Sequence, residues 1–209
     1  MGKYAVGLIA LILIGGGAYY WFMADRTQTE VPQTQAPTQM ATSTYATSTY
    51  SIVYPNDFTK DESYFYDQFS GKPIYGVKFS IPLAVATGTN LSSTSYLSVE
   101  QLPRARKCSG DIYLPDDVKA SDSTENGVLY SVATSTGAAA GSLYEEMVYA
   151  FPKSSPCTAV RYYIRFANMG NFEPGTVREF DRGMLLSALD AIRVSLHMTS
   201  PSSDFELTP

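Results

Sequence analysis

The sequence has few of the residues on which most metal and redox sites depend. Among 209 residues there are two cysteines, Cys108 and Cys157, and one histidine, His197. Their number and spacing do not provide the ligand cluster of a zinc site, and a histidine near a helix end is more typical of a solvent-facing position. We therefore expect no metal and no other cofactor.

The motifs of nucleotide-binding and nucleophilic enzymes are also absent. The chain contains no G-x-S-x-G nucleophile motif, no G-x-x-x-x-G-K-S/T phosphate loop and no G-x-G-x-x-G. Two adjacent carboxylates, Glu145 and Glu146, fall in a predicted strand, where neighbouring side chains point to opposite faces. They therefore cannot act on one substrate, and the sequence predicts a protein that is not an enzyme.

Charged residues are scarce, whereas aromatic residues are plentiful. Charged residues make up 17% of the chain, and the net charge is −5. This balance gives no electrostatic support for nucleic-acid binding, so we expect no nucleic-acid partner. Aromatic residues make up 13% of the chain, with 16 tyrosines, a composition typical of β-strands joined by polar loops.

One stretch without charge decides where the rest of the chain is expected to lie. Residues 4–24 contain no Asp, Glu, Lys or Arg. About 21 residues at ~1.5 Å per residue make a helix of roughly 31 Å, the thickness of a bilayer's hydrocarbon core. Lys3 precedes the stretch, so the positive-inside rule predicts a single-pass membrane protein with its carboxyl-terminal part outside the cytoplasm. The alternative is a signal peptide cleaved after the small residues 16–18, which would release a secreted protein.

Polar segments flank the expected domain. Residues 25–49 are rich in Thr, Ser, Gln and Pro, and residues 41–50 are a tandem copy of ATSTY. Such a composition buries too little apolar surface to offset the entropy of ordering, so we predict a disordered linker over 25–49, whose end leads into the first strand. A disordered tail is predicted over 199–209. The folded domain is expected to span residues 50–198.

Most of this domain is predicted to be antiparallel β-sheet. Runs with strand composition lie at residues 50–58, 63–69, 74–81, 96–102, 128–134, 142–151 and 157–167. Short connections with turn residues predict two hairpins, one from 63–69 and 74–81 and the other from 142–151 and 157–167. The polar residues 109–126 are expected to be irregular.

A helix is predicted at the end of the domain. Thr176 and Glu179 have the spacing of a capping box, in which each side chain satisfies a backbone N–H at the helix start. Apolar residues then recur at helical spacing: Phe180, Met184, Leu185, Ala188, Leu189, Ile192 and Leu196. The expected fold class is α+β, an antiparallel sheet with a carboxyl-terminal amphipathic helix packed on one face.

The clearest candidate for a binding site lies on the strand at residues 157–167. Period-two alternation places Arg161, Tyr163 and Arg165 on one face, with Glu145 or Glu146 on the neighbouring strand. Two guanidinium groups around a tyrosine suit a carboxylate, phosphate or sugar ligand. The alternative is cross-strand Arg–Glu pairing on a solvated face, with no ligand.

The two cysteines give a further expectation. Cys108 and Cys157 both lie in the part of the chain predicted to be outside the cytoplasm, where thiols are commonly oxidised. We therefore predict a disulfide that holds the irregular residues 109–126 near the start of the strand at 157–167. The alternative is two buried free thiols.

The opening strand, Y-S-I-V-Y-P-N-D-F at residues 50–58, resembles that of PsbP-like domains, which occur in uncharacterised membrane-anchored bacterial envelope proteins. The resemblance covers roughly residues 50–198, implies an antiparallel sheet flanked by helices, and carries over no functional residues. We expect a non-catalytic, membrane-tethered binding or assembly module of a bacterial envelope, with an envelope protein or an anionic polymer as partner. The alternative is an envelope enzyme or enzyme inhibitor with a cleft near Arg161 and Arg165.

Overall fold

The computed structural model of the protein describes residues 41–67, 72–115 and 117–199. The predicted membrane anchor at 4–24, most of the predicted linker and the tail from residue 200 onward lie outside these ranges. Within them, no helix has the length and apolar character needed to cross a bilayer.

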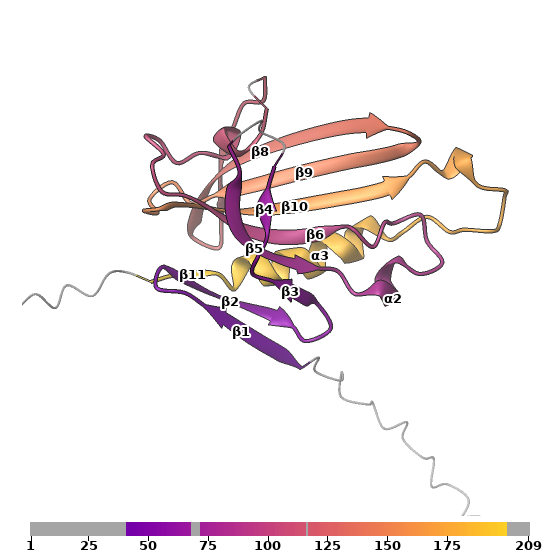
Figure 1. Ribbon diagram of the computed structural model, residues 1–209, viewed down its shortest axis with the longest axis horizontal. Helices are drawn as coiled ribbons and strands as arrows, with labels where there is room; N and C mark the ends of the chain where they lie inside the picture. The colour runs from indigo at the N-terminus through magenta and orange to yellow at the C-terminus, as the bar shows by residue number, and fades with distance from the viewer. Residues whose placement is uncertain (1–40, 68–71, 116, 200–209) are drawn as a thin grey trace, which may run out of the picture. The chain divides into compact units, whose positions relative to one another are not determined.

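A large antiparallel sheet forms the centre of the fold (Figure 1). Its strands are β3 (Thr59–Asp61), β4 (Phe65–Tyr66), β5 (Ile74–Ser80), β6 (Tyr96–Leu102), β7 (Ser121–Glu125), β8 (Val128–Ala139), β9 (Ser142–Ala150) and β10 (Cys157–Ala167). The strand order is β3-β5-β6-β10-β9-β8-β7, and β4 pairs with β5 beside this path. Both predicted hairpins are confirmed, as β4 with β5 and as β9 with β10.

A smaller sheet has the order β1-β2-β11, formed by β1 (Thr42–Ala46), β2 (Tyr50–Pro55) and β11 (His197–Met198). The predicted linker boundary at residue 49 is therefore wrong, because residues 42–46 form a strand. The first copy of ATSTY lies in β1, and in the second copy Thr47 closes the turn by donating its backbone N–H to the Tyr50 carbonyl at 2.8 Å. Tyr45 lies 6.2 Å from the rings of Tyr50 and Phe79, so the tyrosine supplies apolar surface that the polar composition conceals.

The predicted carboxyl-terminal helix is α3 (Arg182–Val194), and it contributes to a core shared by both sheets (Figure 1). Its buried face carries Leu185, Leu189 and Ile192, which the apolar stripe predicted. Met184 belonged to the same predicted stripe, but it is 71% exposed. The core also contains Ile52 of β2 and several residues of β5 and β6.

The predicted capping box is not the start of α3. Asp181 is the N-cap, and its side chain accepts a hydrogen bond from the Met184 backbone N–H at 2.8 Å. Thr176 instead donates its hydroxyl to the Glu173 carbonyl at 2.7 Å, in a turn before the helix. The helix starts later because Asp181, further along the chain, satisfies a free backbone N–H of the first turn, that of Met184.

The opposite face of the large sheet carries a second cluster of buried residues, including Tyr64, Tyr66, Tyr113 and Val148. The region predicted to be irregular contributes a 3-10 helix, η1 (Gly110–Tyr113), as well as β7. The Cys108–Cys157 disulfide is confirmed and joins this region to the first residue of β10. Two further short helices, α2 (Leu83–Ala86) and η2 (Met169–Asn171), lie in loops. Both faces of the sheet are therefore partly covered.

Candidate functional site

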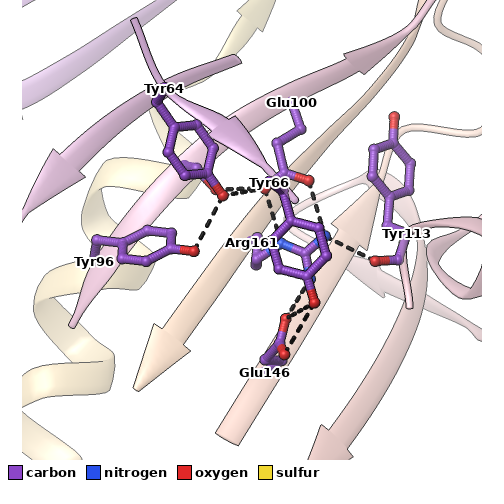
Figure 2. A network of polar contacts seen from close by, with 8 residues as sticks. Tyr64, Tyr66, Tyr96, Glu100, Tyr113, Glu146 and Arg161 are labelled. Carbon is purple, nitrogen blue, oxygen red and sulfur yellow. Dashed lines mark hydrogen bonds and ion pairs between the residues drawn. The ribbon is translucent and has the colours of Figure 1, made fainter. Parts of the chain in front are cut away.

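Arg161 occupies the centre of a buried polar cluster on the face opposite α3 (Figure 2). Its side chain is 0% exposed. Nε donates to Glu100 Oε1 at 2.8 Å and Nη2 to Glu100 Oε2 at 2.9 Å, which is the two-pronged geometry of a strong Arg–carboxylate pair. Nη1 donates to Glu146, and Nη2 also donates to the Tyr113 carbonyl at 2.8 Å. The guanidinium group thus makes these hydrogen bonds to groups inside the protein.

Hydroxyl groups and an aromatic ring complete the cluster. Tyr64 donates its hydroxyl to Glu100 Oε1 at 3.0 Å, and Ser98 donates to the same atom at 2.8 Å. The Tyr66 ring lies 3.6 Å from the Arg161 guanidinium carbon, and its hydroxyl donates to Glu146 Oε2 at 3.0 Å (Figure 2). A buried ion pair is stable only when its remaining hydrogen-bonding atoms are satisfied, and these contacts meet that condition.

The electrostatics of the cluster keep its members in the protonation states that these bonds require. Burial raises the pKa of the Tyr64 phenol, and the Glu100 carboxylate raises it further. Burial likewise raises the pKa of Tyr66. Burial alone would lower the pKa of Arg161, but the adjacent carboxylates of Glu100 and Glu146 raise it above its usual value. The phenols therefore remain donors and the guanidinium remains charged.

Two hollows adjoin this cluster, and both are lined by Tyr163 and Arg165 of β10. The first, of about 510 Å³, extends past Tyr96 toward β4 and β5. The second, of about 490 Å³, extends past Tyr144 and Glu146 to residues 135–139 of β8. Because they share two lining residues, we treat them as one feature, the tyrosine groove, defined by Tyr96, Tyr144, Tyr163 and Arg165.

The groove has aromatic walls and one cation, Arg165, for which the described residues supply no carboxylate partner. The rings of Tyr96 and Tyr163 stack with centroids 5.0 Å apart and an angle of 16° between planes, and Tyr144 lies 6.1 Å from Tyr163. Arg165 donates to the Ser142 hydroxyl at 3.3 Å, and its guanidinium carbon lies 5.4 Å from the Tyr144 ring. Within the described part of the chain Arg165 forms no ion pair, so its charge is available to a ligand.

The structure separates the residues that the sequence grouped as one ligand site. Tyr163 and Arg165 line the groove, whereas Arg161 is enclosed beneath it and pairs with Glu146 of the neighbouring strand. The predicted cross-strand Arg–Glu pairing is therefore confirmed, but its predicted solvated location is wrong. Glu145 lies on the other face and pairs with Arg182 at 2.6 Å. Tyr163 is in register with Glu146, and adjacent strand residues alternate between faces, so Glu146 is the carboxylate on the Arg161 side.

A second buried arginine, which the sequence analysis did not identify, lies on the helix side of the sheet. Arg193 of α3 donates Nε to the Tyr162 hydroxyl at 2.8 Å and Nη2 to Glu125 Oε2 at 2.5 Å. Its guanidinium carbon also lies 4.1 Å from the Tyr149 ring. Because these partners come from β10, β7 and β9, Arg193 fixes the helix on the sheet and is not open to a ligand.

Asn90 is a structural residue that resembles a modification site in the sequence. It begins an Asn-Leu-Ser glycosylation sequon, but it is only 5% exposed. Its side chain donates to the Ala167 carbonyl at 2.8 Å and accepts from the Phe180 backbone N–H at 2.9 Å. In the folded domain the amide is therefore committed to joining the end of β10 to the segment before α3.

Comparisons with known proteins add little to these observations. No family model matches the sequence, and no curated protein matches it. A solved structure of a protein from Bacteroides thetaiotaomicron VPI-5482 is similar over 72% of this chain, with a TM-score of 0.39 and 11% identity. This chain covers 45% of that protein, less than half of its length. Such a likeness carries no argument about function, and the resemblance to PsbP-like domains stays a prediction.

Proposed function

We propose that the chain is a non-catalytic binding module of a bacterial cell envelope. The observation that carries this proposal is the tyrosine groove, in which Arg165 lies among aromatic rings and has no carboxylate partner among the described residues. The buried Arg161 cluster beneath it holds β6, β9 and β10 together through Glu100 and Glu146. A rigid floor of this kind reduces the entropy lost when a ligand binds.

The proposed location is outside the cytoplasm, at the membrane surface. The disulfide between Cys108 and Cys157 supports this location, because such bonds persist mainly in oxidising compartments. The apolar residues 4–24 support a helical anchor, followed by a polar linker that ends where β1 begins at Thr42. If residues 4–24 are instead cleaved, the same module is secreted.

The alternative of an envelope enzyme or inhibitor has weaker support. A hydrolytic site needs a carboxylate or other base that can reach the substrate proton. Glu146 lines the groove, but its carboxylate accepts hydrogen bonds from Arg161 and Tyr66 and is only 15% exposed. It is therefore better suited to hold the floor of a binding site than to exchange protons with a substrate.

Affinity purification from gently solubilised membranes tests the proposal. The full chain is compared with the double variant Tyr163→Ala/Arg165→Ala, which removes the two residues shared by both hollows. The matched control is Tyr75→Ala/Arg182→Ala, since both residues are largely exposed and neither lines the groove. We expect envelope partners or polymers to be retained by the control and lost by the groove variant. Equal capture by the two variants would refute the groove as the binding site.

A further inference from the structure

The chemistry of the groove points to a ligand class, and we propose that it binds an uncharged linear glycan. This inference rests on the proposed binding function and adds the nature of the ligand. Three features of the groove carry it: the kind of side chain on its walls, the balance of charge, and its extent across the sheet.

The walls combine aromatic rings with hydroxyl groups. Tyr96, Tyr144 and Tyr163 supply rings, and the hydroxyls come from Ser80, Ser93, Thr94, Ser135 and Thr136. A sugar ring has apolar C–H faces and a polar hydroxyl edge, so it matches a tyrosine that is apolar on its face and polar at its tip. Hydroxyl side chains can both donate to and accept from sugar hydroxyls.

The charges around the groove are mostly compensated within the protein. Lys78 pairs with Asp61 at 3.2 Å, and Glu146 pairs with Arg161. Asp67 adds a carboxylate to the lining of the first hollow, which further disfavours an anionic ligand. Arg165 has no carboxylate partner in the described ranges, but a single cation is little attraction for an anionic polymer on a chain of net charge −5. Its N–H groups can also donate hydrogen bonds to the hydroxyl oxygens of a sugar. This balance favours an uncharged glycan over the anionic polymer that the sequence suggested.

The extent of the groove favours a chain of sugars over a single one. Its lining residues run from Lys78 of β5, through β6, β10 and β9, to Ser135 of β8. Four steps between neighbouring strands at ~4.8 Å each amount to about 19 Å. A linear polymer laid across the strands would contact Tyr96, Tyr163 and Tyr144 in succession.

Isothermal titration calorimetry with the full chain in mild detergent tests the ligand class. The probes are hexasaccharides of β-1,4-linked glucose and of β-1,4-linked N-acetylglucosamine, with hexagalacturonate as the anionic comparison. We expect at least one neutral hexasaccharide to bind more tightly than hexagalacturonate, with an affinity that changes little with salt because no counterions are released. Tighter binding of hexagalacturonate, or no binding of either neutral probe, would overturn the proposal.

Variants of the groove test whether the hexasaccharide binds there. Tyr163→Ala should weaken binding of the neutral hexasaccharide by about tenfold, as expected for the loss of one aromatic contact. Gly137→Leu should weaken it without removing a contact, because Gly137 lines the second hollow and a Cβ there meets nothing within 4 Å. Tyr75→Ala should leave it unchanged. Binding that survives both groove variants would overturn the proposal.

The two proposals fail in different ways. If Tyr163 and Arg165 are needed for capture from membranes but neither neutral hexasaccharide binds, the binding function stands and the glycan assignment is wrong. If neither membrane capture nor hexasaccharide binding depends on these residues, the binding function itself is wrong.

Discussion

Replacing Arg161 is expected to lower the free energy of unfolding strongly. Arg161→Ala removes the donors of two hydrogen bonds to Glu100, one to Glu146 and one to the Tyr113 carbonyl. Glu100 is 0% exposed, so its carboxylate loses its counterion in a place that water does not reach. Breaking one side of a buried ion pair typically costs about 3–5 kcal/mol, a large part of the stability of an ordinary domain.

The matched control is Arg182→Ala. Arg182 also pairs with a glutamate, Glu145, but its side chain is 50% exposed. Exposed pairs contribute roughly 0.2–1 kcal/mol, so this variant should change the free energy of unfolding little. The contrast between the two variants compares a buried arginine that has several partners with an exposed arginine that pairs with one glutamate.

Urea unfolding of the full chain in mild detergent, followed by near-ultraviolet circular dichroism, measures the difference. The tyrosines of the domain provide the signal; the one tryptophan, Trp21, lies outside the described residues. The double variant Arg161→Met/Glu100→Leu should recover part of the stability that Arg161→Met loses, because it removes the unpaired charge at residue 100. The recovery is partial because Glu146 still lacks its arginine, and the Tyr64 and Ser98 hydroxyls lose their acceptor. The reasoning is refuted if Arg161→Ala loses no more stability than Arg182→Ala.

Three further predictions concern the disulfide, the tyrosines and the sequon. Replacing Cys108 or Cys157 by alanine should lower the free energy of unfolding by up to about 4 kcal/mol, because the disulfide closes a loop with sequence separation 49 and so lowers the entropy of the unfolded chain. An unchanged urea midpoint would contradict this prediction. Burial raises the pKa of Tyr64 and Tyr66, so the folded state holds protons that the unfolded state loses near pH 10. The contribution of these two phenols to the free energy of unfolding should therefore be constant below about pH 10 and fall as the pH rises above it. A urea midpoint that does not change from about pH 9 to 11 would argue against buried phenols. Asn90→Ala should destabilise the domain by about 1–3 kcal/mol for each backbone group that loses its partner, the Ala167 carbonyl and the Phe180 N–H. An unchanged urea midpoint, or a glycan on Asn90 in the folded protein, would show that the side-chain amide does not make these bonds.

The sequence predicts the strands well where one local pattern determines them. In residues 157–167 apolar and polar side chains alternate, and β10 forms there as Cys157–Ala167. The hairpin with β9 follows, because the two runs are separated by a short turn-forming connection. The disulfide was likewise predictable, since two cysteines allow one intramolecular pairing.

The candidate site was less predictable, because its contacts join distant parts of the chain. Arg161 lies 61 residues from Glu100, its main partner. Alternation correctly put Arg161 on the same face as Tyr163 and Arg165, but it could not show that Tyr66 and the region of Tyr113 cover one end of that face. Deciding which glutamate faces Arg161 also required the register of β9 and β10, which places Glu146 on this face and Glu145 on the other.

At the amino-terminal edge of the domain, the amino-acid composition gives a wrong prediction. The repeated Thr and Ser residues of 41–50 are typical of a linker, yet Tyr45 and Tyr50 pack against the core beside β5. A segment of low average hydrophobicity can fold when a few large side chains reach an existing core, since each buries a large apolar area. The extent of that core is a tertiary property and does not appear in a local window of sequence.

Photo-crosslinking in intact cells is the most direct test of the groove as the binding site. A benzophenone amino acid is placed at Ser135, which lines the groove, and in a separate strain at Tyr75, which is 66% exposed and lies outside it. Binding in the groove predicts an ultraviolet-dependent adduct from residue 135 that is absent from residue 75 and is lost when Tyr163 and Arg165 are changed to alanine. The account is contradicted if residue 135 yields no adduct, or if both positions yield the same adducts.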